Sequence, residues 1–341
     1  MPKATPLTAA LPPGLNVRSH VLLASLWSNY GHIYRLTLAA SPRDTLILKL
    51  IQAPPASASS SSSHLRKLVS YRVERYFYAH LSTRLPALLA PVARSYPVAP
   101  LSRHSALLLQ DLTPTFPASS GNPHAVLRWL ANFHATFWGT QDTTPLLTTA
   151  DAGDDDAAGV WAQGGYWHLD TRRDEFADTT GYASVCAFAE DVAARLKRRD
   201  VPGVTLLHGD CKSANIVFEP AGERCALYDF QYVGVGFGVQ DVVYFVATSV
   251  RGGRLAEEGE EEALLRLYYA EVVAALERRG VVDVAYTWEV VVEQWECALV
   301  DWMRFMAGWG CWGNAAWVER RVRGICRRWE EEGRGGGGGS L

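Results

Sequence analysis

Short apolar runs near the start of the chain predict β-strands. Residues 31–40 (GHIYRLTLAA) and 44–52 (DTLILKLIQ) are rich in aliphatic and β-branched side chains, and the SPRD stretch between them supplies turn residues. This arrangement predicts a β-hairpin. Residues 104–112 (HSALLLQDL) predict a further strand that ends at Asp111.

Apolar positions at helical spacing dominate the rest of the chain. One helix is predicted among the strands, at residues 64–81, with Leu65, Val69, Val73, Tyr76 and His80 on one face. Further helices are predicted at residues 123–139, 260–280 and 286–310. The fold class is therefore α+β: a small strand-rich lobe, a larger helical lobe and a cleft between them.

Three segments differ in composition from the predicted core. Residues 52–63 form a Pro/Ser/Ala loop that we expect to be mobile, and residues 148–159 form a small, acidic, solvated insertion. The tail, residues 333–341, is rich in glycine and is predicted to be disordered. The organisation that follows is a flexible terminus at 1–15, a small lobe at 16–113 and a large lobe at 114–332.

Composition narrows the class of protein. Of the 341 residues, 48% are hydrophobic and 20% charged, with a formal net charge of −3, which is ordinary for a globular protein and offers no general attraction to nucleic acid or a membrane surface. No apolar run is long enough to span a membrane, and the N-terminus lacks the apolar stretch of a secretory signal. The six cysteines are scattered, as in reduced cytosolic proteins. We expect a cytoplasmic location and infer no obligate protein partner.

A lysine interrupts one of the apolar strands. Lys49 shares a strand face with Ile47 and Ile51, so an unpaired ammonium there would be costly. It either reaches water from the strand's edge or pairs with a carboxylate to bind phosphate. Glu74, on the only predicted helix of this lobe, is the available acid. Its alternative is a surface pair with Arg72, Arg75 or Lys67.

A second polar cluster follows a buried strand, in residues 206–218 (LLHGDCKSANIVF). Asn215 comes five positions after Asp210, and the chain then turns and returns through a predicted hairpin to Asp229. A hairpin brings its two outer ends together, so these three oxygen-bearing side chains should lie close to one another. Hard oxygen ligands suit Mg²⁺ and not zinc.

Other chemistries find less support in the same residues. Cys211 lacks the histidine and asparagine arrangement of a thiol nucleophile, and no further ligands complete an HxD metal site. Residues 233–238 (VGVGFG) have the wrong spacing and context for a dinucleotide fingerprint.

Taken together, these motifs resemble the protein-kinase-like small-molecule kinases: aminoglycoside phosphotransferases, choline and ethanolamine kinases, and ecdysteroid-kinase-like proteins. The resemblance covers roughly residues 26–250, and the C-terminal helices match only in general character. Residues 208–218 (HGDCKSANIVF) look like the family's catalytic loop, and 227–245 (LYDFQYVGVGFGVQDVVYF) like its metal-binding segment and the following helix. LWSNYGHIYRLTL resembles a shortened phosphate-covering loop, LLLQDL the hinge, and LANFHATFW the first helix of the large lobe. The implied fold is a bilobal protein-kinase-like one, with the nucleotide bound in the small lobe.

By this resemblance the chain would transfer the γ-phosphate of ATP to a hydroxyl of a small molecule. Asp210 would be the catalytic base, and Lys212 would either neutralise the transferred phosphoryl group or be a plain surface charge. Asn215 and Asp229 would hold Mg²⁺. The structural supports would be His208, through hydrogen bonds, and Asp241, as a clamp on the catalytic loop.

The resemblance also implies a nucleotide site. Lys49 and Glu74 would position the α- and β-phosphates, and the hinge would be Gln110, Asp111 and Leu112. The phosphate loop departs from the GxGxxG pattern, since it has the single glycine Gly31. Ser28 and Asn29 are the candidates to supply its donors. This departure motivates a second hypothesis, that the chain is a catalytically silent kinase-like nucleotide-binding or scaffold protein.

The sequence favours a small acceptor over a protein. Only eleven residues separate Asp229 from Asp241, which leaves little chain to dock a peptide. The predicted helix at 286–310 carries tryptophans at 288, 295, 302 and 309, with glutamates at 289, 293 and 296 beside them. The tryptophans either pack the helix onto its lobe or, with the acidic residues, line a pocket for a cationic acceptor. Residues 164–170 (GGYWHLD) lie where the family places acceptor loops.

Overall fold

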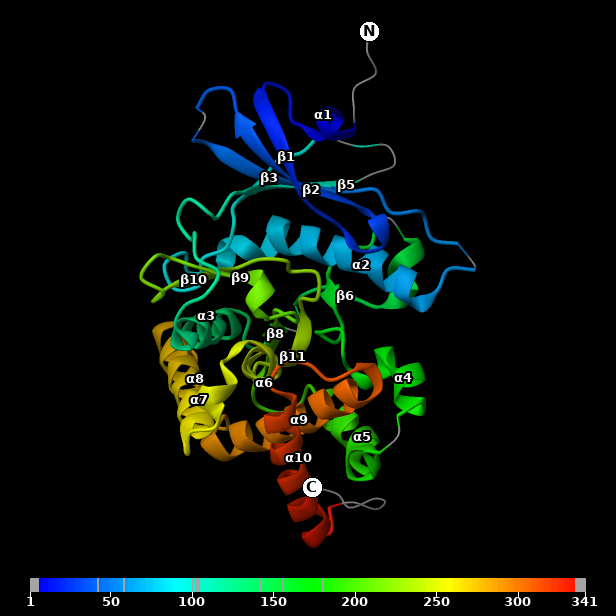
Figure 1. Ribbon diagram of the computed structural model, residues 1–341, viewed down its shortest axis with the longest axis vertical. Helices are drawn as coiled ribbons and strands as arrows, with labels where there is room; N and C mark the ends of the chain where they lie inside the picture. The colour runs from blue at the N-terminus through cyan, green and yellow to red at the C-terminus, as the bar shows by residue number, and fades with distance from the viewer. Residues whose placement is uncertain are drawn as a thin grey trace.

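The structure is a computed structural model with two lobes, a β-sheet above a larger body of helices (Figure 1). It describes residues 6–41, 43–57, 59–99, 101, 105–140, 143–154, 156–179 and 181–334. The predicted α+β architecture with two lobes is therefore confirmed. No helix in the described part of the chain is both long and apolar enough to cross a bilayer.

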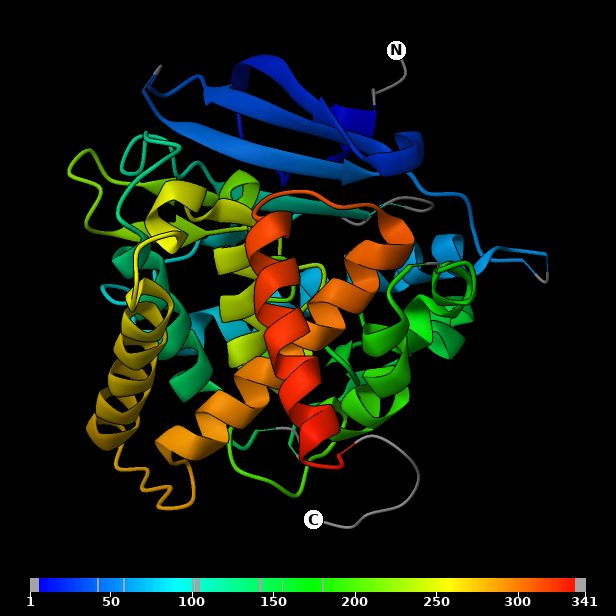
Figure 2. The same ribbon diagram turned by 60° about the horizontal axis from the view of Figure 1, so that its bottom comes forward.

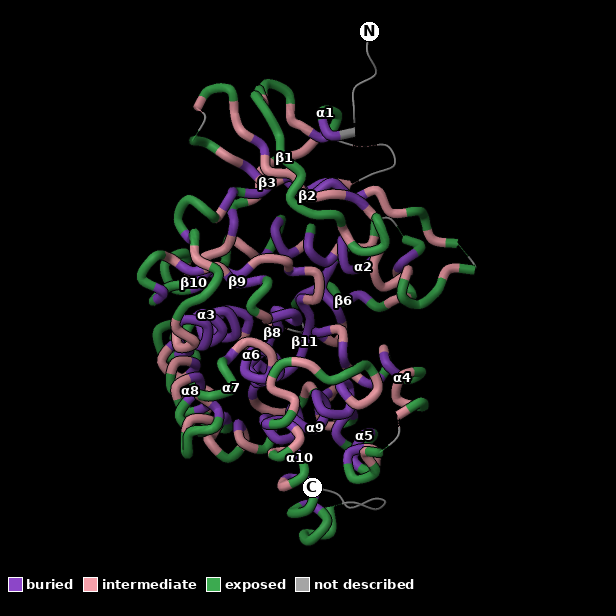
Figure 3. The backbone as a smooth tube through the Cα atoms, viewed as in Figure 1, coloured by how far each residue is buried: buried purple, intermediate pink, exposed green. Residues whose placement is uncertain are grey.

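The small lobe is built on a five-stranded antiparallel sheet with the order β1-β2-β3-β5-β4. Its strands are β1 (Val17–Ser25), β2 (Gly31–Leu38), β3 (Thr45–Ile51), β4 (Ser95–Tyr96) and β5 (Ser105–Gln110). The predicted hairpin is the β2–β3 pair, in which Ile33 lies opposite Lys49. The edge strand β1 was not predicted, because it is exposed along almost its whole length and lacks alternation of buried and exposed positions (Figure 3).

The segment before the sheet is more ordered than the sequence indicated. We predicted residues 1–15 to be a flexible terminus. Helix α1 (Pro6–Ala10) instead buries Leu7 and Ala10 in the small-lobe core, against Leu36 and Leu48. Residues 1–5 lie outside the described residues.

Helix α2 (Ser62–Tyr76) lies between the small-lobe sheet and the large lobe (Figure 1). Ser61 caps its N-terminus by accepting a hydrogen bond from the His64 amide. The helix continues as a π-helical turn, η2 (Phe77–Leu81), which ends the regular helical register. The side chains of Phe77, Tyr78 and Leu81 are consequently buried, whereas Tyr76 is half-buried and His80 exposed, contrary to the predicted face.

The large lobe contains two small sheets and a set of helices. Strands β6 (Leu146–Leu147), β7 (Val160–Trp161), β11 (Gly234–Phe237) and β8 (Val204–Leu207) form one, and the hairpin β9 (Ile216–Phe218) and β10 (Cys225–Leu227) the other. The longer helices are α3 (Pro123–Thr136), α5 (Ala183–Leu196), α6 (Val239–Ser249), α8 (Glu260–Arg278), α9 (Trp288–Trp309) and α10 (Ala315–Glu331). The shorter ones are α4 (Arg173–Ala177) and α7 (Gly252–Leu255). Figure 2 shows α10, in red, crossing α9, in orange.

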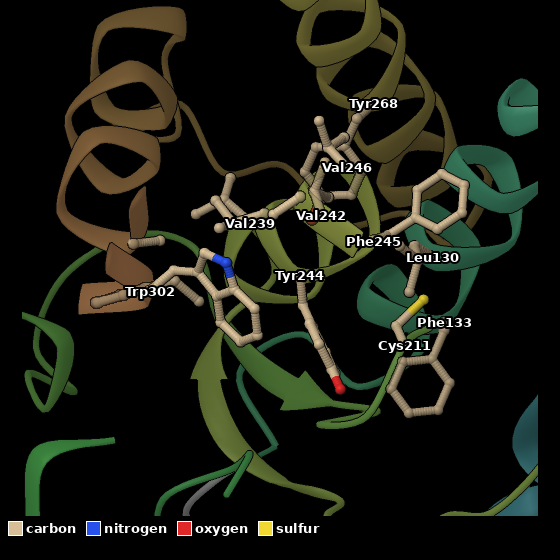
Figure 4. Packing of buried hydrophobic residues seen from close by; sticks show 14 of the residues in the cluster. Leu130, Phe133, Cys211, Val239, Val242, Tyr244, Phe245, Val246, Tyr268 and Trp302 are labelled. Atoms are coloured by element: carbon tan, nitrogen blue, oxygen red, sulfur yellow. The ribbon is translucent and has the colours of Figure 1, made fainter. Parts of the chain in front are cut away.

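The helix α6 lies at the centre of the large-lobe core. Its Val242 and Phe245 lie among the buried side chains of α3, including Leu130 and Phe133, and its Tyr244 contacts Trp302 of α9 (Figure 4). The predicted helices at 123–139, 260–280 and 286–310 correspond to α3, α8 and α9. This packing holds the N-terminus of α6 beneath the loop that follows β8.

The acidic insertion is only partly solvated. Within residues 148–159, the short helix η4 (Thr149–Gly153) is closed by a capping box between Thr148 and Asp151, and Ala152 is buried. Arg72 of α2 donates to the backbone carbonyls of Asp151 and Ala152 at 2.7 and 2.8 Å. The insertion therefore packs against α2, which the composition alone did not indicate.

Candidate active site

The strand lysine is paired with two carboxylates. Lys49 of β3 is buried, and its Nζ lies 2.6 Å from Oε2 of Glu74 and 2.9 Å from Oδ1 of Asp229. Burial lowers the pKa of Lys49, but the attraction of Asp229 and Glu74 outweighs it and raises the pKa overall. Burial raises the pKa of Glu74 despite its lysine partner. The contacts exclude both an edge-exposed Lys49 and a surface pairing of Glu74.

The segment predicted to be the catalytic loop, residues 208–218, is held in place by α6. The Asp241 carboxylate accepts hydrogen bonds from the backbone N–H groups of His208 at 2.6 Å and Gly209 at 2.9 Å. The His208 ring donates from Nε2 to the Tyr228 carbonyl at 3.1 Å and accepts the Asp210 amide at Nδ1, 3.2 Å away. Burial lowers the pKa of His208, so its ring is neutral and serves as a bridge between loop and hairpin.

Asp210 lies at the centre of this cluster and is 4% exposed. Its Oδ1 accepts from the Tyr244 hydroxyl at 2.9 Å and from Lys212 Nζ at 3.0 Å, and its Oδ2 accepts from the Asn215 amide at 2.8 Å. Burial raises the pKa of Asp210 to about 6, with Lys212 acting in the opposite direction. A carboxylate whose pKa lies near neutral pH, with charged and neutral hydrogen-bond donors around it, is suited to accept a proton from a hydroxyl group.

Hydrogen bonds link Asp210 to two tyrosines that we did not single out from the sequence. The Tyr244 hydroxyl, at the end of the ring that Figure 4 labels, also lies 2.8 Å from the hydroxyl of Tyr166. Tyr166 belongs to the 164–170 segment that the resemblance assigned to the acceptor side. Tyr244 comes three residues after Asp241, one turn of α6, and that spacing is the available sequence clue.

The predicted hairpin brings the remaining oxygen ligands to the same place. The Tyr228 amide donates to the Asn215 carbonyl at 3.1 Å, so Asp229 follows directly beside Asn215. Asp229 has a left-handed backbone, with φ of 67°, which is uncommon for a non-glycine residue. Since the Asn215 nitrogen donates to Asp210, its side-chain oxygen and the Asp229 carboxylate fit a hard cation. No cluster of three histidine, cysteine or acidic ligands occurs among the described residues.

Cys211, between these groups, is fully buried. Burial holds the pKa of its thiol well above the usual value, so a thiolate nucleophile is disfavoured.

The loop between β1 and β2 contains the short helix η1 (Trp27–Asn29). Ser28 and Asn29 both have left-handed backbones, with φ of 58° and 56°. Gly31, with φ of 138°, is required by space, because a Cβ there would lie 1.9 Å from the Leu50 carbonyl oxygen. The Ser28 hydroxyl accepts a hydrogen bond from Lys67 at 2.6 Å.

At the predicted hinge, the Asp111 carboxylate is fully used by the protein. It accepts from Arg35 Nε at 2.7 Å, from the Thr45 hydroxyl at 2.9 Å, and from the amide and hydroxyl of Thr113. These hydrogen bonds lower the pKa of Asp111 despite its burial. Gln110 ends β5 with an exposed side chain, and the Leu112 carbonyl accepts the amides of Thr115 and Phe116. The side chain of Asp111 therefore ties the hinge to β2 and β3.

The tryptophan stripe of α9 is mainly a packing surface. Trp295 and Trp302 are buried, and Trp288 is half-buried against Arg266. Trp309 is 52% exposed, but the guanidinium of Arg172 lies 4.4 Å from its ring. The neighbouring acids are also engaged: Glu293 pairs with Arg195 and Glu296 with Arg328, while Glu289 is exposed. The two buried tryptophans and the paired glutamates therefore pack the helix onto its lobe.

Comparison with known proteins identifies the family. The phosphotransferase enzyme family (APH) matches residues 22–278, and the chain belongs to this family. The comparison with curated proteins found no match.

Solved structures share the fold at low identity. The choline kinase from Cryptosporidium parvum Iowa II is 9% identical, with a TM-score of 0.52 over 95% of this chain and 94% of that one. Amicoumacin kinase hAmiN, in complex with AMP-PNP, Ca²⁺ and Ami, is 12% identical, with a TM-score of 0.49 over 94% and 90%. Choline kinase LicA from Streptococcus pneumoniae is 13% identical, with a TM-score of 0.48 over 92% and 95%. By family, the chain is thus a phosphotransferase.

Proposed function

We propose that this protein transfers the γ-phosphate of ATP to a hydroxyl group of a small molecule, with Mg²⁺ as the metal. The observation that supports this most directly is a pair of contacts, from Lys49 to Asp229 and from Asn215 to Asp210, which the hairpin brings together through the hydrogen bond between Tyr228 and Asn215. It combines a phosphate-binding cation, hard metal ligands and a base in one site.

Each group has a defined task in this proposal. Lys49, oriented by Glu74, binds the α- and β-phosphates. Bound Mg²⁺, held by Asn215 and Asp229, would neutralise charge on the phosphates. Asp210 orients the acceptor hydroxyl and takes its proton as the oxygen bonds to the γ-phosphorus and the bond to ADP breaks. Lys212 is placed to neutralise the transferred phosphoryl group, because it already contacts Asp210.

The acceptor can be found by a screen. ADP release would be measured with amino alcohols, aminoglycosides, sugars and sterols, and the product checked by mass spectrometry for one added phosphoryl group. We expect one class to give ADP release with stoichiometric phosphorylation. Phosphate incorporation into protein substrates instead would contradict the small-molecule assignment.

The alternative is a kinase-like protein that binds nucleotide or a partner without catalysis. The phosphate loop supports it, since this loop has one glycine and two non-glycine residues in left-handed conformations. The paired Lys49 and the intact Asp210, Asn215 and Asp229 argue against it. Thermal unfolding with millimolar MgATP separates the phosphotransferase from a protein without a nucleotide site, because only the phosphotransferase should be stabilised. A silent protein that still binds nucleotide would be stabilised as well, and the absence of ADP release in the acceptor screen would identify it.

A further inference from the structure

Lys67, in the second turn of α2, touches the tip of the β1–β2 loop. Its Nζ donates to the Ser28 hydroxyl at 2.6 Å and lies over two aromatic rings, 5.7 Å from that of Trp27 and 5.2 Å from that of Tyr30. The Trp27 side chain is 82% exposed, so this arrangement stands at the surface of the loop.

The charge of Lys67 is not neutralised by this arrangement. In the part of the chain that the structure describes, no aspartate or glutamate forms an ion pair with it, whereas Lys49 has two carboxylate partners. Aromatic faces and a hydroxyl group stabilise an ammonium without cancelling its charge. Partial burial lowers the pKa of Lys67, as expected where no acid compensates. The ammonium therefore remains available to an anion.

The position of Lys67 on α2 relates it to the proposed phosphate site. Lys67 precedes Glu74 by seven residues, so both lie on nearly the same face of α2, about 10 Å apart along the helix axis. The loop ends beside the strand that carries Lys49, because the Gln52 amide, three residues after Lys49, donates to the Tyr30 carbonyl at 2.7 Å. Lys67 thus contacts the loop at Ser28, while the strand β2 that follows the loop pairs with the strand that carries Lys49.

We propose that Lys67, together with Ser28, binds the terminal phosphates of the nucleotide and supplies positive charge that this glycine-poor loop needs. This inference rests on the proposed use of ATP. Lys49 contacts the phosphates nearest the nucleoside, and Lys67 contacts those farthest from it. A phosphate bound here accepts a hydrogen bond from Lys67, either in place of the Ser28 hydroxyl or in addition to it.

The test compares the affinities of the full chain for ATP, ADP and AMP, each with Mg²⁺, by calorimetric titration. For K67Q we expect the Kd of ATP to rise about tenfold, that of ADP to rise less, and that of AMP to stay unchanged. K67R keeps the cation and should stay within about threefold of the wild type for all three. R75Q removes an exposed cation from the last turn of the same helix and should bind all three nucleotides normally.

Three results would overturn the assignment of Lys67. One is wild-type ATP affinity in K67Q, and another is an equal loss for ATP and AMP, which would mean that Lys67 only holds the loop in place. The third is a K67R variant as weak as K67Q. If the wild type itself bound no nucleotide, the proposed use of ATP would fail as well. If the wild type bound ATP normally and one of the three results above occurred, only the assignment of Lys67 would fail.

Discussion

At the scale of single residues, the Asp210 carboxylate accepts hydrogen bonds from three side chains. Its Oδ1 is shared by Tyr244, which is buried, and by Lys212, whose side chain is 37% exposed. A buried aromatic ring has one position, whereas a long exposed side chain can move at little cost. We therefore expect Tyr244 to fix the carboxylate and Lys212 to make room for the acceptor hydroxyl.

Tyr244→Phe removes one hydroxyl and leaves the ring packed against Trp302 and Trp167. We expect kcat to fall about tenfold, the size of one hydrogen bond to a charged group, with MgATP affinity unchanged. Tyr269→Phe is the matched control, because its hydroxyl donates to the Tyr286 carbonyl within the large lobe. Wild-type kcat in Tyr244→Phe would show that this hydrogen bond does not hold the base.

The pKa of Asp210 sets the expected pH dependence. A base works in its deprotonated form, and burial raises the pKa of this carboxyl to about 6. The value of kcat/KM should consequently fall about tenfold per pH unit below roughly pH 6 and level off above it. A pH profile that stays flat down to pH 4.5 would contradict the raised pKa.

At the scale of elements, the parts of the site that are close in sequence could be predicted. Asp210, Asn215 and Asp229 belong to one loop and one tight hairpin, so their spacing already determines that they meet. Tyr166 reaches Tyr244 from a distant segment, through a contact that no local pattern encodes. The exposed strand β1 lacks the alternation of apolar and polar residues by which a strand is recognised. Regular helical spacing assigns Tyr76 and His80 to the buried face of α2, but the π-helical turn after α2 changes which side chains are buried.

The loop that carries Asp210 depends on α6. Asp241→Asn puts a neutral amide where a buried carboxylate accepts two backbone N–H groups, so we expect a loss of about 2–3 kcal/mol in the free energy of unfolding. Activity should fall together with stability. Asp191→Asn, an exposed position on α5, is the control. Thermal unfolding at the wild-type temperature in Asp241→Asn would mean that the loop is held by other contacts.

At the scale of the whole molecule, the site exists only where the two lobes meet. Lys49 comes from the small-lobe sheet and Asp229 from the large lobe, and Arg66 of α2 donates to the Thr171 carbonyl of the large lobe. The two-lobed fold was predictable from the change of periodicity along the chain. The contact of Arg66 with Thr171 was not, since it uses a backbone carbonyl, which any sequence offers.

The central claim is that Asp210 is the base of a phosphoryl transfer from ATP. The most direct measurement is ADP release by the wild type and by Asp210→Asn, with the acceptor found in the screen and with MgATP affinity measured on both proteins. We predict that Asp210→Asn binds MgATP like the wild type and loses at least about a hundredfold in kcat. An unchanged rate of ADP release in Asp210→Asn would contradict the account.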